Sequence, residues 1–297
     1  MKNYPVNLVT LPNGETIAYR EAGQGEQTVV LLHGNMSSSL FFDTLMEQME
    51  ANYKLIAFDL RGFGDSSYNR PITSLLDLTQ DVVQASEALG LKRFSVLGWS
   101  TGGGVALELA ASRPDAVDKV ILVNSVSLAG YPMFKKDAAG QPKLTERITT
   151  REEVAADPVQ VLPILHAYAT GNKELLRSVW NALIYHEAKP CPERYERYLE
   201  AMLKQRNLVD VDYALITHNM TATHNGVVAG TGRIDLVQAP VLVVQGENDR
   251  VVPPAWAKDT AAALGSKATL QVLPDVGHSP FTDSLDELVA LLSAYLR

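Results

Sequence analysis

The chain of 297 residues is long enough to bury one large core, either as a single domain or as a domain that carries an inserted smaller one. Its composition, 46% hydrophobic and 20% charged, is that of a globular protein and excludes extensive disorder. The formal net charge of -8 excludes a basic platform, so no nucleic-acid partner is expected.

The N-terminal residues do not have the pattern of an export signal. They lack the continuous apolar stretch that a signal peptide or a membrane span requires, so no membrane insertion is expected. Cys191 is the only cysteine and cannot form an internal disulfide, which fits a reducing compartment. We therefore expect a cytoplasmic protein, whose oligomeric state stays open.

The first predicted element is a hairpin. Residues 8–11 and 15–20 flank the sequence Pro-Asn-Gly at 12–14, which is a turn signal. We expect these two segments to pair as antiparallel strands at one edge of a sheet.

Short runs rich in valine, isoleucine and leucine follow, and several of them end in glycine or aspartate. Such runs are typical of strands that are buried on both faces of a parallel sheet. Helix-like segments at 76–89, 101–112 and 255–264 lie between several of these runs. The alternation predicts a doubly wound α/β sheet whose functional loops lie at the carboxyl ends of the strands. The predicted strands are residues 28–32, 54–58, 94–97, 119–123, 241–244 and 268–273.

The loop at 59–66 reads Asp-Leu-Arg-Gly-Phe-Gly-Asp-Ser. Its glycines do not match a phosphate-binding pattern, so we interpret the loop as a structural turn and expect no nucleotide cofactor. The sequence also lacks a helical His-Glu-x-x-His arrangement and paired cysteines, so no metal is expected.

The strongest chemical signal is the pentapeptide Gly-Trp-Ser-Thr-Gly at 98–102. It follows an apolar strand and opens a helix-like run. In such a strand-turn-helix elbow the nucleophile stands on a strained backbone, and the small residues two before and two after it let strand and helix approach closely. The pattern predicts Ser100 as a catalytic nucleophile.

The alternation of predicted strands and helices is interrupted between residues 130 and 235. Candidate helices at 151–155, 159–170, 173–185 and 193–205 are separated by proline or glycine signals, and no comparably strong strand run appears. We interpret residues 130–235 as an inserted helical cap over the carboxyl edge of the sheet, and residues 1–129 and 236–297 as the core.

A serine hydroxyl needs a base, and the base needs a carboxylate to hold its tautomer. His278 lies in the loop after the last predicted strand, and Asp249 lies just after the strand at 241–244. Glu247 is the rival carboxylate in the same turn, but Asp249 occupies the usual position for the acid. The chain order Ser100, Asp249, His278 also fits this architecture.

The tetrahedral intermediate needs N–H donors for its oxyanion, and one donor is expected from Thr101, the residue after the nucleophile. The second donor is expected from the loop His-Gly-Asn-Met-Ser at 33–37. Its position favours Asn35 and leaves Met36 as the alternative. We interpret His33 and Gly34 as residues that shape this turn.

Together these motifs resemble the α/β-hydrolase superfamily over essentially the whole chain. The resemblance implies an α/β-hydrolase fold, a mostly parallel sheet with an inserted helical cap, and a serine hydrolase that needs no cofactor. It rests on His-Gly-Asn at 33–35, Asp-Leu-Arg-Gly-Phe-Gly at 59–64, Gly-Trp-Ser-Thr-Gly-Gly at 98–103, Asp249, and Gly277 with His278.

A finer likeness is to the Bacillus-type intracellular poly(3-hydroxybutyrate) depolymerases. The hexapeptide at 98–103 and the sequence Arg-Gly-Phe-Gly-Asp-Ser-Ser-Tyr-Asn at 61–69 are similar to theirs, as are residues 179–181 and 205–209. This resemblance implies an ester substrate in a storage polyester and contact with the surface of the polyhydroxybutyrate granule. Aromatic side chains of the insertion are candidates for that contact, although packing or pocket lining is the stronger interpretation for each. They are Tyr131, Phe134, Tyr168, Trp180, Tyr185, Tyr195 and Tyr198.

Two alternatives stay open. One is a carboxylesterase or lactonase for small esters, with the same catalytic residues and a closed pocket. The other is a protein of a different class, a catalytically idle hydrolase fold that binds a ligand or sits on granules. A dehalogenase or epoxide hydrolase of similar architecture is not expected, because those enzymes carry aspartate where Ser100 stands.

Overall fold

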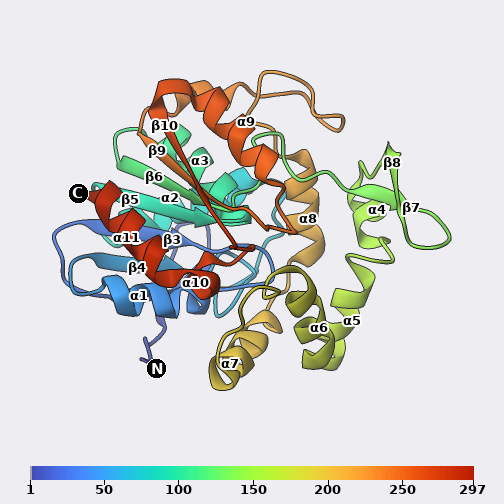
Figure 1. The fold of residues 1–297 in the computed structure, drawn as a ribbon, viewed down its shortest axis with the longest axis horizontal. Coiled ribbons are helices and arrows are strands. Elements are labelled where there is room, and N and C mark those ends of the chain that lie inside the picture. Colours follow the sequence, from blue (N-terminus) through green and yellow to red (C-terminus); the bar gives the residue numbers. More distant parts are fainter. Residues whose placement is uncertain (1) are drawn as a thin grey trace.

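The computed structural model describes residues 2–297 and contains a central sheet with helices on both sides (Figure 1). Among these residues the sheet has eight strands in the order β1-β2-β4-β3-β5-β6-β9-β10. The β1–β2 and β2–β4 pairs are antiparallel, whereas the remaining pairs are parallel. The strands are β1 (Asn7–Thr10), β2 (Thr16–Ala22), β3 (Thr28–Leu32), β4 (Lys54–Phe58), β5 (Phe94–Trp99), β6 (Val117–Val123), β9 (Val241–Gly246) and β10 (Ala268–Leu273).

The two faces of the sheet carry separate hydrophobic clusters because side chains alternate along each strand. Leu31 and Leu97 pack on the face covered by α1 and α11, whereas Val30 and Val96 pack on the face covered by α2, α3 and α9. The helices outside residues 130–235 are α1 (Asp43–Met49), α2 (Leu75–Ala88), α3 (Thr101–Ser112), α9 (Pro254–Leu264), α10 (Pro280–Asp283) and α11 (Leu285–Leu296). The 3-10 helices are η1 (Ser39–Phe42), η2 (Arg233–Leu236) and η3 (Gly265–Lys267).

The predicted fold class, an α/β sheet that is mostly parallel, is confirmed. The hairpin expected at 8–20 forms an edge of the sheet as β1 and β2. Three of the predicted strands differ at their ends: β5 continues through Gly98 to Trp99, β6 begins at Val117, and β9 continues to Gly246. The extensions of β5 and β9 carry the backbone directly into the loops that hold Ser100 and Asp249.

The segment at residues 130–235, called the 130–235 segment below, lies beyond the carboxyl edge of the sheet (Figure 1). It contains the predicted helices and two features that the sequence did not reveal, the hairpin β7–β8 and the helix α8. The strands β7 and β8 form their own sheet and are largely exposed, so they have no hydrophobic run. Its elements are β7 (Phe134–Lys136), β8 (Pro142–Arg147), α4 (Arg151–Ala155), α5 (Leu162–Thr170), α6 (Lys173–Leu183), α7 (Pro192–Met202) and α8 (Leu208–Thr217).

The 130–235 segment does not have a hydrophobic cluster of its own. Trp180 and Tyr198 belong to the same cluster as Phe41 and Trp99 beside the sheet. The rings of Phe41 and Tyr198 stack with centroids 4.2 Å apart, and those of Phe41 and Trp180 are 5.2 Å apart. The helices of the segment are therefore packed firmly onto the sheet edge. Within the described chain, no helix combines the length and apolarity needed to cross a membrane.

Candidate active site

Ser100 stands on a strained turn between β5 and α3. Its φ of 55° and ψ of -121° are unusual for a residue with a side chain. A Cβ atom on Gly98 would lie 2.2 Å from the carbonyl oxygen of Gly102, and one on Gly102 would lie 2.1 Å from that of Leu32. Glycine is required at both positions because strand and helix approach so closely. The local geometry is that of the predicted elbow.

Asp249 and His278 come together at the ends of two neighbouring strands. The Nδ1 atom of His278 is 2.8 Å from Oδ2 of Asp249, and both side chains are buried. The Oδ1 atom of Asp249 accepts hydrogen bonds from the backbone N–H groups of Val251 at 2.7 Å and Val252 at 2.9 Å. Glu247, the rival carboxylate, is exposed on the same turn. The structure thus brings His278 to Asp249.

The surroundings of Asp249 favour its charged form. Burial alone would raise the pKa of its carboxyl, but the charge and hydrogen bond of His278 and the N–H groups of Val252 and Val251 hold that pKa below its usual value. The ionised carboxylate can fix the imidazole tautomer and stabilise its protonated form.

Asn124 joins the loops that carry the acid and the histidine, and no sequence motif singles it out. It follows β6 with a φ of 44° and is fully buried. Its Nδ2 donates to the carbonyl oxygen of Gly277 at 2.8 Å, and its Oδ1 accepts from the N–H of Gly246 at 2.8 Å. Trp99 Nε1 also donates to the carbonyl oxygen of His278 at 2.9 Å. The bonds to the carbonyl oxygens of Gly277 and His278 hold the histidine loop against the strands.

Ser100 and His278 line one cavity, together with Thr101 and Asn35. The hydrogen bonds formed within residues 2–297 do not include one between Ser100 and His278. Catalytic hydrogen bonds are often long before a substrate binds, so this geometry is compatible with proton transfer in the complex.

The two candidates for the second oxyanion donor differ in their hydrogen bonds. The N–H of Met36 is already used, because it donates to Gln205 Oε1 at 3.1 Å and to Asn35 Oδ1 at 3.0 Å. The N–H of Asn35 has no acceptor among the described residues. Thr101 is the first residue of α3, so its N–H has no partner within the helix. These contacts favour Asn35 and Thr101 as the donor pair.

His33 is fully buried below this loop. Its Nε2 accepts a hydrogen bond from the N–H of Leu60 at 3.0 Å, and its Nδ1 lies 2.8 Å from the carbonyl oxygen of Gly34. Burial lowers the pKa of His33 although the charge of Asp59 opposes that shift. The contacts agree with a role of His33 in shaping the turn.

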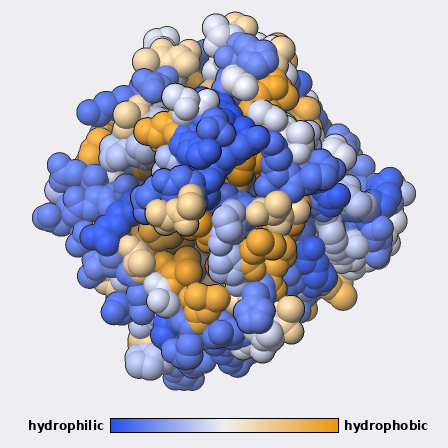
Figure 2. All heavy atoms as spheres, turned by 90° about the vertical axis from the view of Figure 1, so that its right-hand side faces the viewer, coloured by the Kyte–Doolittle hydropathy of each residue, from blue (hydrophilic) through white to orange (hydrophobic). Residues whose placement is uncertain are grey.

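The cavity has a volume of about 430 Å³ and lies between the catalytic loops and the 130–235 segment. Seen from the side of this segment, hydrophobic atoms surround a hollow in the surface (Figure 2). Apolar side chains dominate the lining, among them Met133, Ile164, Trp180, Leu183 and Leu208. A site of this size and polarity fits a small organic ester.

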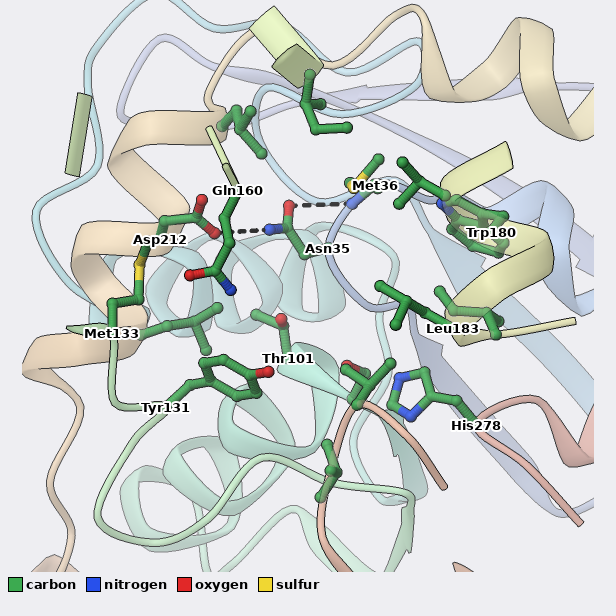
Figure 3. Close-up of a pocket in the computed structure, with 18 of the residues that line it drawn as sticks. Asn35, Met36, Thr101, Tyr131, Met133, Gln160, Trp180, Leu183, Asp212 and His278 are labelled. Carbon is green, nitrogen blue, oxygen red and sulfur yellow. Dashed lines mark hydrogen bonds between the residues drawn. The ribbon is translucent and has the colours of Figure 1, made fainter. Parts of the chain in front are cut away.

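Asp212, Tyr131 and Gln160 also line the cavity (Figure 3). Pocket lining is one of the interpretations that the sequence favours for Tyr131, whereas no sequence signal points to Asp212 or Gln160. Asp212 is on α8, a helix that was not predicted, so its position over the site could not be inferred. No group of three or more His, Cys, Asp or Glu side chains in residues 2–297 is placed to hold a metal ion.

The comparisons with known proteins agree with this geometry. A family model described as alpha/beta hydrolase fold matches residues 27–285. The chain belongs to the α/β-hydrolase family. The predicted enzyme class, a carboxylic ester hydrolase, is confirmed by this family and its relatives.

The curated relatives of this α/β-hydrolase include a pimeloyl-acyl-carrier-protein methyl ester esterase of Nitrosomonas europaea. The two chains are 30% identical over 271 residues, which is 90% of this chain and 94% of the relative. Among solved structures, an esterase from Exiguobacterium antarcticum has a TM-score of 0.74 at 19% identity and covers 98% of both chains. An enol-lactonase from Burkholderia xenovorans has a TM-score of 0.75 at 17% identity and covers 98% of this chain and 99% of its own. At these identities the structural likeness concerns the fold.

Proposed function

We propose that this α/β-hydrolase cleaves small carboxylic esters through an acyl-enzyme formed on Ser100. The observation that carries the proposal is the buried Asp249–His278 pair, whose Nδ1 and Oδ2 atoms are 2.8 Å apart, at the cavity that Ser100 also lines. The position of Ser100 on a strained elbow supports the role of nucleophile.

In the proposed reaction His278 takes the proton of Ser100 as Oγ attacks the ester carbonyl carbon. Asp249 stabilises the imidazolium that forms, and the N–H groups of Thr101 and Asn35 bind the oxyanion. His278 then gives its proton to the leaving alcohol. A water molecule, activated by the same imidazole, releases the acid and restores Ser100.

The size of the cavity and the relatives favour a small ester or lactone over a polymer. A cavity of about 430 Å³ encloses a short acyl chain. The relatives described above are named esterases and a lactonase, which supports the same substrate class. These observations support the small-ester interpretation better than the depolymerase interpretation.

The polyester depolymerase stays a second candidate because hydrophobic side chains are exposed on the 130–235 segment. Leu144, Val159, Leu162 and Leu183 are 72%, 47%, 46% and 41% exposed. The expected aromatic contacts are less suited to a granule surface, because several of them are buried. Those are Trp180, Tyr185, Tyr195 and Tyr198.

The test combines labelling with two substrates. Wild type and Ser100→Ala are treated with a fluorophosphonate probe and assayed with p-nitrophenyl butyrate and with native amorphous poly(3-hydroxybutyrate) granules. We expect labelling of the wild type alone, and a kcat for the small ester that is lower by a factor of about 10⁶ in Ser100→Ala.

Serine-dependent release of 3-hydroxybutyrate from granules would establish the depolymerase instead. Retention of activity in Ser100→Ala would overturn the assignment of the nucleophile. Failure of the probe to label the wild type, with ligand binding preserved, would favour the idle ligand-binding protein.

A further inference from the structure

The cavity contains one acidic side chain besides its catalytic groups. Among the described residues that line it, Asp212 is the only carboxylate, and none is lysine or arginine. Figure 3 shows Asp212, Gln160 and Tyr131 on one side of the cavity and His278 on the other. A substrate in this cavity therefore meets an acidic group without a neighbouring cation.

Asp212 has unused hydrogen-bonding capacity. Its Oδ1 atom accepts a hydrogen bond from Asn35 Nδ2 at 2.9 Å, and within residues 2–297 its Oδ2 atom accepts none. Asn35 is itself fixed, because its Oδ1 accepts from Gln205 Nε2 at 2.7 Å. The carboxyl group is thus held in place with one oxygen available to a ligand.

The orientation that the proposed mechanism requires of the ester places its acyl chain near Asp212. In the proposed mechanism His278 protonates the leaving alcohol, so that alcohol lies on the His278 side of the ester carbonyl. The acyl chain extends from the carbonyl to the opposite side, where Asp212 and Tyr131 line the wall (Figure 3).

We propose that Asp212 selects esters whose acyl chain is uncharged and bears a hydroxyl group, and that it excludes acyl chains that end in a carboxylate. This inference rests on the proposed ester hydrolase. A substrate hydroxyl donates to the free oxygen of Asp212, and a hydrogen bond to a charged acceptor is among the stronger ones. A substrate carboxylate is repelled, because two like charges lie close together in a poorly solvated site.

The charge of Asp212 depends on pH, so the proposed selection is expected to depend on pH as well. Burial raises the pKa of Asp212 to about 7, against the hydrogen bond from Asn35 and together with the negative charge of Asp157. Lys136 Nζ pairs with Asp157 Oδ2 at 2.9 Å and weakens the charge of Asp157, so burial is the main cause of the raised pKa of Asp212. Repulsion of a substrate carboxylate therefore increases as the pH rises through 7 and Asp212 ionises.

The other titratable groups that face Asp212 are not expected to produce the same pH dependence of substrate choice. Burial raises the pKa of Tyr131 and of Tyr168, so both phenols stay neutral around pH 7. His278, across the cavity, performs the same proton transfers with every ester, so its contribution cancels in a ratio of two substrates.

The experiment compares three p-nitrophenyl esters of equal length, the hexanoate, the 6-hydroxyhexanoate and the adipate monoester, from pH 6 to 8. For the wild type we expect kcat/KM of the hydroxy ester to exceed that of the hexanoate by about tenfold. We expect the adipate to be disfavoured by at least about tenfold at pH 8 and by less at pH 6.

Asp212→Asn keeps an oxygen that can accept from Asn35 but removes the charge. We expect it to raise the adipate-to-hexanoate ratio by about tenfold at pH 8 and to make that ratio independent of pH. Asp235→Asn is the matched control, because Asp235 is an exposed carboxylate in η2 that does not line the cavity. This control is expected to keep the wild-type ratios.

An adipate ester that the wild type accepts as well as the hexanoate at pH 8 would overturn the proposal without any variant. Equal ratios in wild type and Asp212→Asn would also overturn it. In both cases serine-dependent hydrolysis of the hexanoate would leave the proposed ester hydrolase standing. Absence of that hydrolysis would instead remove the proposed function and this inference with it.

Discussion

The two walls of the cavity have different structural origins. The catalytic wall consists of short loops at the ends of parallel strands, where Ser100, Asp249 and His278 are held by backbone hydrogen bonds and close glycine contacts. The opposite wall belongs to the 130–235 segment, where helices present Trp180 and Asp212 from a packed hydrophobic cluster.

The two walls contribute to function in different ways. Loops fixed by β-strands position reacting atoms, because the strand ends converge at one edge of the sheet. Helices that pack by side-chain contact shape the space around those atoms and decide which substrates fit. We therefore expect changes in the catalytic wall to lower kcat, and changes in the other wall to alter stability or substrate choice.

After the loss expected for Ser100→Ala, the largest effect concerns Asp249. Asp249→Asn should lower kcat for p-nitrophenyl butyrate by about 10³–10⁴, because the amide no longer holds the required tautomer of His278. The amide oxygen can still accept from Val251 and Val252, so the loop should stay folded. Steady-state kinetics and circular dichroism of the variant test both statements.

Glu247→Gln is the matched control for Asp249, because Glu247 is an exposed carboxylate on the same turn. Its kcat is expected to stay close to that of the wild type. A large loss in this control, with Asp249→Asn unaffected, would assign the acid to Glu247 instead.

The second prediction concerns the hydrophobic cluster that both walls share. Trp180→Ala should lower the free energy of unfolding by about 3–5 kcal/mol, because a fully buried aromatic side chain is removed from contact with Phe41 and Trp99. Calorimetry is expected to show one unfolding transition, since no separate cluster supports the 130–235 segment.

Leu162→Ala on α5 serves as a control for that variant, because Leu162 is 46% exposed. It should change the free energy of unfolding by less than about 1 kcal/mol. Two transitions in the wild type, with Trp180→Ala shifting only one of them, would show that the 130–235 segment folds by itself.

The smallest effect is a pH dependence at the junction between α8 and α3. His218 ends α8 beside Glu108 of α3, with its Nδ1 3.9 Å from Oε1, and burial lowers the pKa of His218 to about 4. The unfolded chain therefore binds a proton on this residue from about pH 6.5 downward, whereas the folded protein does so only near pH 4. Neutral His218 therefore leaves the free energy of unfolding undiminished above pH 6.5. As the pH falls to 4, we expect protonation of His218 in the unfolded chain to lower the free energy of unfolding by up to about 3 kcal/mol.

Urea unfolding at several pH values measures this contribution. His218→Gln should flatten the dependence between pH 6.5 and 4, whereas His224→Gln, which changes an exposed histidine, should keep it. An unchanged slope in His218→Gln would mean that other groups cause the loss of stability in acid.

The catalytic wall could be predicted from the sequence because its signals are local. The glycines at 98 and 102 belong to a pentapeptide that is recognisable within a single strand-turn-helix unit, and Asp249 and His278 each follow a recognisable hydrophobic strand. Parallel strands direct their carboxyl ends to one edge, so the convergence of Ser100, Asp249 and His278 follows from topology.

The contacts of Asn124, Gln205 and Asp212 became apparent only in the tertiary structure. Asn124 acts through hydrogen bonds to Gly246 and Gly277, which are distant in the chain. Gln205 and Asp212 reach Asn35 through the packing of the 130–235 segment, which depends on side chains from the whole molecule and leaves no periodic trace in the sequence. Local sequence patterns thus predict the fold and the expected chemistry, whereas the shape and charge of the cavity depend on long-range packing.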